Sequence, residues 1–266
     1  MIKRIISASV LALLIIPIVI YGRLPFDILI YLIAVFSLNE FLQIKEKKKA
    51  LPNFIKIISF IMFLLVIFSF NDLDKNIFII DVRTILALLL VFLIPTVLYH
   101  NKEIYSINDA FYLIGSILFL GITFSSIIYL RHVSFNLLFY VILIAVATDT
   151  YAYFGGYFIG KHKLIKEVSP NKTWEGTIVG TLFCVLVCSF FYINFVNINA
   201  SIISAVGITL FLSILGQFGD LVFSAIKRYY EQKDYSNLIP GHGGILDRLD
   251  SITFIVLGLM FIITII

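Results

Sequence analysis

Residues 177–196 read TIVGTLFCVLVCSFFYINFV and contain no charged side chain. A helix of that length rises about 30 Å, which matches the hydrocarbon core of a bilayer. Similar runs recur along the chain, since 61% of its 266 residues are hydrophobic and only 14% are charged. The runs lack the alternation with period two that a membrane barrel strand requires. Because backbone groups in lipid need internal hydrogen-bond partners, the composition predicts an all-α, polytopic membrane protein.

About nine membrane-spanning helices fit these runs best. The expected ranges are about 5–21, 24–43, 54–70, 82–99, 111–130, 134–158, 177–196, 200–221 and 251–266. Lys3 and Arg4 precede the first run, so that run also resembles a signal peptide, but no small-x-small cleavage site follows it. An uncleaved first span is therefore expected, and the whole chain is interpreted as one transmembrane domain. That domain would have N-terminal spans over about 5–130 and site-bearing spans and loops over about 134–266.

The distribution of basic residues predicts the orientation of these spans. With a cytoplasmic N-terminus, the outside segments hold only Arg23, Lys75, Arg83 and Arg131, and the rest of the 20 Lys and Arg residues lie inside. This bias follows the positive-inside rule. It predicts a cytoplasmic N-terminus and an outside C-terminus in the cell membrane. The net charge of +4 then needs no nucleic-acid partner, and the KEKKK run at 45–49 is interpreted as an anchor to anionic lipid headgroups.

Two cysteines lie within the seventh span, four residues apart. Zinc would need further Cys or His ligands nearby, and Cys184 and Cys188 have none in the surrounding sequence. They are therefore interpreted as small apolar packing residues.

The polar chemistry gathers in two inside segments, 159–176 and 222–250. The eighth span ends in Asp220, and Ser224, Lys227 and Arg228 follow at offsets that place them on one helical stripe. Asp247 and Asp250 are three residues apart at the start of the ninth span. Carboxylates beside lipid are costly unless a cation offsets them, and oxygen ligands of this kind suit Mg²⁺. The alternative is an ordinary helix start with Asp in its first turn.

Glycines flank His242 and would let backbone N–H groups approach an anion closely. The polar segment reads Ser224-x-x-Lys227-Arg228, then Lys233-Asp234, then Pro240-Gly241-His242-Gly243-Gly244-x-x-Asp247-Arg248-x-Asp250. With these motifs the chain resembles the phosphatidate cytidylyltransferase (CDP-diacylglycerol synthase) family. The resemblance implies an enzyme that joins CTP to phosphatidic acid, giving CDP-diacylglycerol and pyrophosphate. It also implies Mg²⁺, a possible second cation such as K⁺, and a homodimer.

The first polar segment supports the same resemblance. Asp149 lies in the apolar sixth span, and an intramembrane carboxylate is by default a candidate functional residue. The stretch 169–176 reads SPNKTWEG, and the family usually has Lys where this chain has Asn171. Any phosphate contact at that position is therefore in doubt, whereas Lys172 is in place. The spacing Gly155-x-x-x-x-Gly160-Lys161 resembles a Walker A loop, but His162 replaces the required Ser or Thr and a membrane span precedes it.

A role is predicted for each of these polar residues. In the reaction that the resemblance implies, the attacking phosphate monoester is already anionic, so no strong base is needed. Catalysis should therefore rest on charge neutralisation and in-line positioning of the reactants. The candidate catalytic residues are Asp247, Lys227, Arg228 and Asp220; the candidate metal ligands are Asp220, Asp247, Asp250 and Asp149; the candidate substrate-binding residues are Ser224, Lys172, Thr173, His242, Gly243, Gly244 and Arg248. His242 either bonds a phosphate or orients a loop, and Asp149 either holds a second cation or ties helices together.

Other functions compete with this interpretation. A transporter could use Asp149 and Asp220 as midplane relay groups, but the polar residues concentrate at one membrane face. A CTP-dependent polyprenol kinase, or a cytidylyltransferase for another lipid phosphate, would share the metal and nucleotide chemistry. A CDP-alcohol phosphotransferase is disfavoured because its paired Asp-Gly and double-Asp motif is absent.

Overall fold

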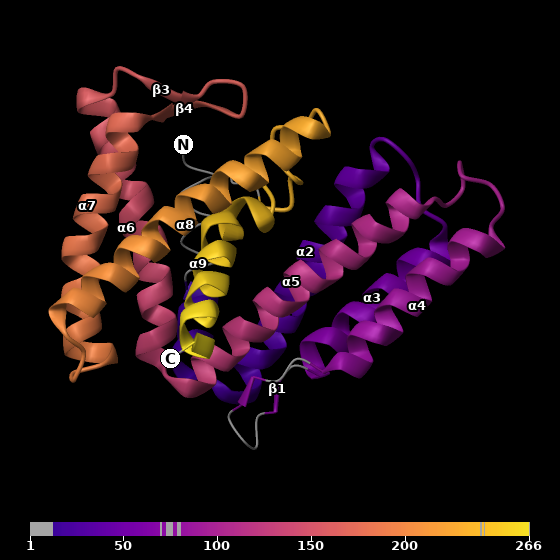
Figure 1. The fold of residues 1–266 in the computed structure, drawn as a ribbon, viewed down its shortest axis with the longest axis horizontal. Coiled ribbons are helices and arrows are strands. Elements are labelled where there is room, and N and C mark those ends of the chain that lie inside the picture. Colours follow the sequence, from indigo (N-terminus) through magenta and orange to yellow (C-terminus); the bar gives the residue numbers. More distant parts are fainter. Residues whose placement is uncertain are drawn as a thin grey trace. The chain divides into compact units, whose positions relative to one another are not determined.

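The computed structural model describes residues 13–69, 71–72, 77–78, 81–239, 241 and 243–265 (Figure 1). The fold is all-α, as predicted. Helical residues 13–21 are followed by α2 (Arg23–Glu46), α3 (Asn53–Ser69), α4 (Val82–Leu98), α5 (Ile107–Val133), α6 (Phe135–Ile159), α7 (Trp174–Phe191), the π-helix η1 (Tyr192–Val196), α8 (Ile202–Tyr229) and α9 (Leu246–Ile265).

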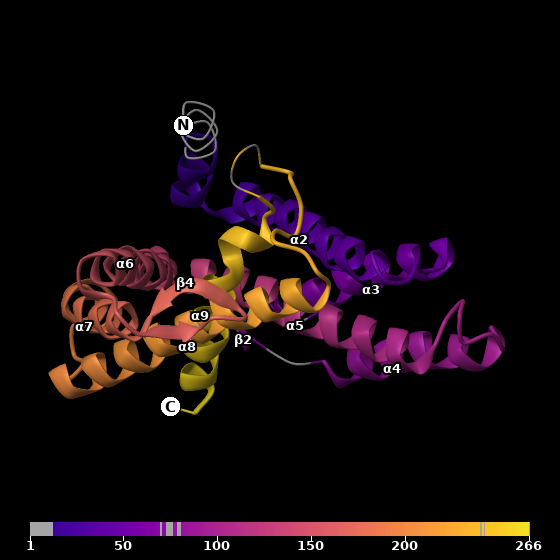
Figure 2. The ribbon, with the colours of Figure 1, turned by 90° about the horizontal axis from the view of Figure 1, so that it is seen from above.

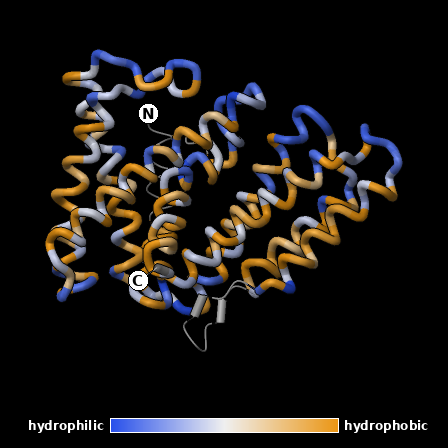
Figure 3. Tube along the Cα trace, in the orientation of Figure 1, coloured by the Kyte–Doolittle hydropathy of each residue, from blue (hydrophilic) through white to orange (hydrophobic). Residues whose placement is uncertain are grey.

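Five helices in the described part of the chain are long and apolar enough to cross a membrane. They are α2, α5, α6, α7 continued by η1, and α8, whereas α3 and α4 are apolar but shorter. Many large apolar side chains point outward, and Leu186 and Phe190 on α7 are each 68% exposed. Such surfaces are rare on soluble proteins. Figure 3 shows apolar residues along the helices and hydrophilic residues at helix ends and in connecting segments, which is the distribution that a bilayer requires.

Two short antiparallel strand pairs lie between helices, and neither was predicted. β1 (Asn71–Asp72) pairs with β2 (Ile77–Phe78) between α3 and α4. β3 (Lys163–Ile165) pairs with β4 (Ser169–Thr173) between α6 and α7. The second pair falls within the first of the polar segments singled out in the sequence.

The chain divides into two compact units. The first contains residues 1–133 and 234–246, and the second contains residues 134–233 and 247–266. In the first unit, α5 packs against α2, α3 and α4. A Cβ at Gly121 of α5 would lie 2.6 Å from Val66 of α3, so the glycine permits that close approach.

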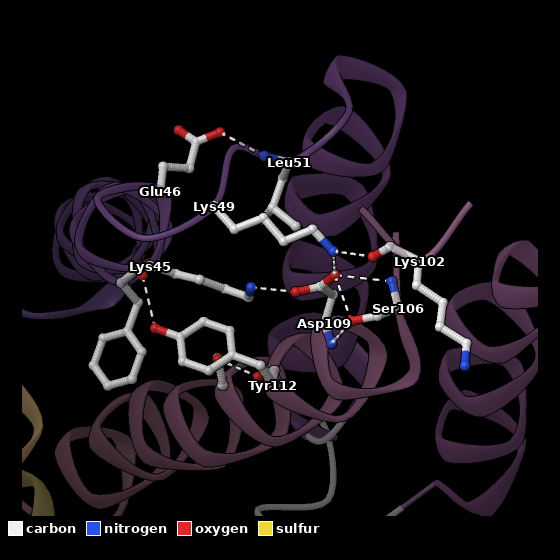
Figure 4. A network of polar contacts seen from close by, with 10 residues as sticks. Lys45, Glu46, Lys49, Leu51, Lys102, Ser106, Asp109 and Tyr112 are labelled. Atoms are coloured by element: carbon white, nitrogen blue, oxygen red, sulfur yellow. Dashed lines mark hydrogen bonds and ion pairs between the residues drawn. The ribbon is translucent and has the colours of Figure 1, made fainter. Parts of the chain in front are cut away.

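An ionic cluster joins the end of α2 to the start of α5 (Figure 4). The Asp109 carboxylate forms ion pairs with Lys45 and with Lys49, the latter at 2.5 Å. It also accepts a hydrogen bond from the backbone N–H of Ser106 at 2.8 Å. Lys49 in turn donates to the carbonyl of Lys102 at 2.7 Å. Two lysines of the KEKKK run are thus engaged within the protein, which corrects the interpretation of the whole run as a headgroup anchor.

The second unit is built on α6, α7 and α8, which pack against one another (Figures 1 and 2). Glycines let α9 approach α8 closely. A Cβ at Gly216 would lie 2.8 Å from Ile255, and one at Gly219 would lie 2.7 Å from the Asp250 carbonyl oxygen. The backbones of the two helices therefore meet where α8 carries its polar residues.

Candidate active site

The start of α7 fixes the β3–β4 pair to the second unit. The Thr173 hydroxyl accepts a hydrogen bond from the Gly176 N–H at 3.2 Å and caps the helix. The Glu175 carboxylate accepts from the backbone N–H groups of Lys161 and His162 and contacts His162 Nδ1 at 2.6 Å. Because α6 is helical through Ile159, the Walker-like glycine spacing forms no phosphate-binding loop, as expected.

Small residues bring α6 and α7 into close contact. A Cβ at Gly176 would lie 2.6 Å from the Ala152 carbonyl oxygen, and one at Gly180 would lie 2.7 Å from the Thr148 carbonyl oxygen. Next to this contact, α6, α7, α8 and β4 line an open cavity of about 460 Å³. The cavity is lined by Asp149, Ala152, Tyr153, Gly156, Tyr157, Asn171, Lys172, Thr173, Gly176, Thr177, Gln217 and Asp220.

Four residues predicted from the sequence thus share one cavity, although they come from three elements. Lys172 forms an ion pair with Asp220, and Asp149 lies within electrostatic range of both. The Ser224 hydroxyl donates to Asp220 Oδ1 at 3.3 Å. Asn171, the departure from the resembled pattern, also lines the cavity beside Lys172. The arrangement combines a cation with several carboxylates, as recognition of a phosphate together with a metal ion would require.

A second ion pair joins α8 to the start of α9. Lys227 Nζ lies 2.6 Å from Asp247 Oδ1, and the two side chains are only 10% and 4% exposed. Asp250 lies one turn further along α9, within electrostatic range of Asp220 and Lys227. One of its oxygens accepts the Ser251 N–H at 2.8 Å. Sequence reasoning placed Asp247 and Asp250 together, and the structure adds Lys227 as the direct partner of Asp247.

The two arginines predicted for the site, Arg228 and Arg248, are more exposed than Lys172 and Lys227. Arg228 is exposed and donates to two backbone carbonyl groups, that of Gln232 at 3.0 Å and that of Val168 at 3.4 Å. The second bond links the end of α8 to the turn between β3 and β4. Arg248 is exposed on the first turn of α9. Their roles as phosphate contacts stay predictions.

The glycine-rich loop belongs to the first unit. Gly243 has a φ of +84°, a left-handed conformation that favours glycine. Gly244 is buried against the carboxylate of Glu40 on α2. His242 lies outside the described residues, so the choice between its two predicted roles stays open.

Comparison with known proteins shows the family to which the chain belongs. A family model described as "Cytidylyltransferase family" matches residues 2–266. The chain belongs to the cytidylyltransferase family. It is 36% identical to a phosphatidate cytidylyltransferase of Bacillus subtilis (strain 168) over 266 residues, covering 98% of this chain and 97% of that protein. It is 35% identical to the enzyme of the same name from Staphylococcus aureus (strain COL) and 36% identical to that from Staphylococcus haemolyticus (strain JCSC1435), each over 95% of both chains.

Mg²⁺ is the metal predicted for this site, and the carboxylates of the site decide whether it fits. Among the described residues, no group of three or more His, Cys, Asp or Glu side chains is gathered as a metal site. Asp220 and Asp247 are instead neutralised by Lys172 and Lys227. Mg²⁺ commonly takes only one or two protein carboxylates and completes its shell with water and substrate phosphates. The oxygen-only donors around Asp220 fit that mode of binding.

Sequence reasoning missed a second cavity beside the first. It has a volume of about 440 Å³ and is lined mostly by apolar side chains from β3, α7 and α8, including Ile178, Leu182 and Phe218. It shares Thr177 and Gln217 with the first cavity. Gln217 donates to the Thr181 hydroxyl at 2.7 Å. A buried amide within an apolar span was the available signal, because such a group needs a partner.

Proposed function

We propose that this chain transfers the cytidylyl group of CTP to phosphatidic acid, giving CDP-diacylglycerol and pyrophosphate. One observation carries the choice of a lipid substrate: a charged cavity and an apolar cavity adjoin at Thr177 and Gln217. An anionic headgroup attached to acyl chains has the matching two-part chemistry. Membership of the cytidylyltransferase family supplies the reaction type, and the names of the relatives suggest the lipid.

In the proposed reaction, a phosphate oxygen of phosphatidic acid attacks the α-phosphorus of CTP. A new phosphorus–oxygen bond forms, the bond from the α-phosphorus to the bridging oxygen breaks, and pyrophosphate leaves with that electron pair. The attacking oxygen is already anionic, so no strong base is required. The main barrier is repulsion between the two anions, and positive charge held nearby lowers it.

Lys172 and Lys227 are the residues proposed to supply this charge. The Lys172 ammonium is paired with Asp220, and the Lys227 ammonium is paired with Asp247. Each can turn toward a phosphate oxygen while the carboxylate remains as an oxygen donor. Ser224, which donates to Asp220, would keep that carboxylate oriented. Thr173, Gly243, Gly244, His242, Arg228 and Arg248 complete the proposed substrate contacts.

The proposed Mg²⁺ ligands are one or two carboxylates drawn from Asp220, Asp247, Asp250 and Asp149. Asp149 is also the proposed ligand of a second cation such as K⁺. Bound there, Mg²⁺ would neutralise phosphate charge and assist the departure of pyrophosphate. A homodimer is proposed from the resemblance alone.

The chain is proposed to cross the cell membrane with about nine spans, a cytoplasmic N-terminus and the site facing the cytoplasm. The uneven distribution of Lys and Arg supports this orientation. Reporter fusions at residues 165 and 235 should be cytoplasmic, and a fusion at residue 198 should be outside. Opposite locations for 165 and 235 would contradict the shared site.

The direct test is purified protein in mixed micelles with labelled CTP. We expect pyrophosphate release only when CTP, phosphatidic acid and Mg²⁺ are all present. Equal turnover of CTP with a polyprenol and no phosphatidic acid would favour the kinase instead. Solute flux into proteoliposomes without nucleotide would favour the transporter.

A further inference from the structure

Glu40 is a buried carboxylate near the end of the apolar helix α2, and it is only 2% exposed. Its hydrogen-bond partners in the described part of the chain lie about 200 residues further along, within the same compact unit. Oε1 accepts hydrogen bonds from the Ser236 hydroxyl at 2.5 Å and from the Ile245 N–H at 2.9 Å. Oε2 accepts from the Leu246 N–H at 2.9 Å.

These contacts explain how a charged group is tolerated there. A buried carboxylate is costly unless hydrogen bonds satisfy it, and Glu40 receives three. Leu246 is the first residue of α9, where the backbone N–H groups have no partner within the helix. The partial positive charge at a helix N-terminus also favours an anion. Glu40 therefore acts as a capping carboxylate supplied by a distant helix.

The glycine-rich loop is shaped to receive this carboxylate. A Cβ at Gly244 would lie 2.5 Å from Glu40 Oε1, so a side chain at that position would displace the carboxylate. The loop is further closed by the Ile239 N–H, which donates to the Gly243 carbonyl at 2.9 Å. The Glu40 contacts thus hold the segment that carries the glycines and ends one residue before Asp247.

We propose that Glu40 is a positioning residue for cytidylyl transfer, and this inference rests on the proposed function. Its carboxylate holds Gly243 to Leu246 in one conformation and so fixes the backbone from which Asp247 extends. Glu40 itself touches no reacting atom in this scheme. A displacement of about 1 Å in a site residue can cost about 10²-fold in rate, so loosening the segment should lower kcat.

The test compares Glu40→Gln with Glu46→Gln in the full-length protein. Glutamine keeps the shape of Glu40, but its NH2 group must face a donor N–H, of either Ile245 or Leu246. Glu46 is a matched control on the same helix, because its side chain is more exposed. Among the described residues it forms an ion pair with Lys56 at 3.0 Å and accepts from the Leu51 N–H at 3.2 Å. Amide hydrogen exchange is measured over residues 236–247. The kcat, per folded molecule, and the KM for CTP are measured separately.

We expect Glu40→Gln to raise exchange at Ile245 and Leu246 about tenfold and to lower kcat about 10²-fold. KM for CTP should change less than about threefold, since ground-state binding is not the target. Glu46→Gln should match the wild type in both measurements. Ser236→Ala removes one hydrogen-bond donor and no charge. Its exchange rates and kcat should therefore lie between those of Glu40→Gln and Glu46→Gln.

Two results would overturn the inference: unchanged exchange in Glu40→Gln, or raised exchange with an unchanged kcat. A wild-type protein that releases no pyrophosphate from CTP and phosphatidic acid would instead overturn the proposed function, and with it the positioning role. The two failures are distinguishable because exchange is measured without substrate.

Discussion

The buried pair between Lys227 and Asp247 makes a stability prediction that separates a catalytic role from a structural one. At the observed 2.6 Å separation, the Coulomb attraction is roughly 6 kcal/mol for an effective dielectric constant of about 20. Most of that gain offsets the cost of removing both charges from solvent. Removing one partner, however, leaves the other charge buried and typically costs about 3–5 kcal/mol.

Asp247→Asn alone should therefore destabilise the fold by about 3–5 kcal/mol. That loss corresponds to roughly 6–20 °C in Tm for a chain of this size. The double variant Asp247→Asn/Lys227→Gln removes both charges and should recover more than half of the loss. The assay is thermal unfolding of detergent-solubilised protein, followed by pyrophosphate release at a temperature where every variant is folded.

Asp81→Asn is the matched control for these variants. Asp81 caps α4 and accepts from the Arg83 N–H at 2.9 Å, and within the described ranges no buried cation pairs with it. Since Asn caps helices about as well as Asp, stability and activity should be unchanged. We expect the double variant to be stable and inactive. An active double variant would remove Lys227 and Asp247 from the catalytic machinery, and a normal Tm for Asp247→Asn would refute the desolvation argument.

Two further predictions concern α7. Ile178→Trp should fill the apolar cavity and raise the KM for long-chain phosphatidic acid at least several-fold, without changing the KM for CTP. Leu186 lies outside both cavities, so Leu186→Trp should change neither KM. Equal effects of the two substitutions would refute the assignment of the apolar cavity to acyl chains. Gly180→Ala should cost about 1–3 kcal/mol of stability, because its Cβ would lie 2.7 Å from the Thr148 carbonyl oxygen. A Cβ at Gly207 would meet no atom within 4 Å, so Gly207→Ala should be neutral or stabilising by up to about 1 kcal/mol. Equal melting temperatures for Gly180→Ala and Gly207→Ala would contradict the close packing of α6 and α7.

Hydropathy identified the helices well but misplaced some of their ends. The eighth span was predicted to end at 221, yet α8 continues to Tyr229. Hydropathy reports where lipid ends, whereas the helix ends where its backbone bonds end. Charged residues such as Lys227 are good helix formers, so the helix extends beyond the apolar run. This extension is what carries Ser224 and Lys227 on the same helix as Asp220.

The β3–β4 pair escaped prediction for a different reason. Its strands have three and five residues, and residues 169–173 read SPNKT, without alternating apolar positions. The pair is instead fixed by contacts at its ends, the Thr173 cap and the Glu175 bonds to Lys161 and His162. Local sequence contains no signal for such contacts, because they depend on where α6 ends and α7 begins.

Glu40 shows the same limit over a longer distance. In the sequence it stands five residues before Lys45, where the KEKKK run begins, near the end of an apolar span. An acidic residue in such a place usually faces the interface. Its burial depends on donors from residues 236–246, which only the folded chain brings to it. The motif around Asp247 could be recognised because its residues are close in sequence and chemically distinctive. The carboxylate that holds the preceding loop is neither, so only the three-dimensional structure connects the N-terminal half of the chain to the loop before Asp247.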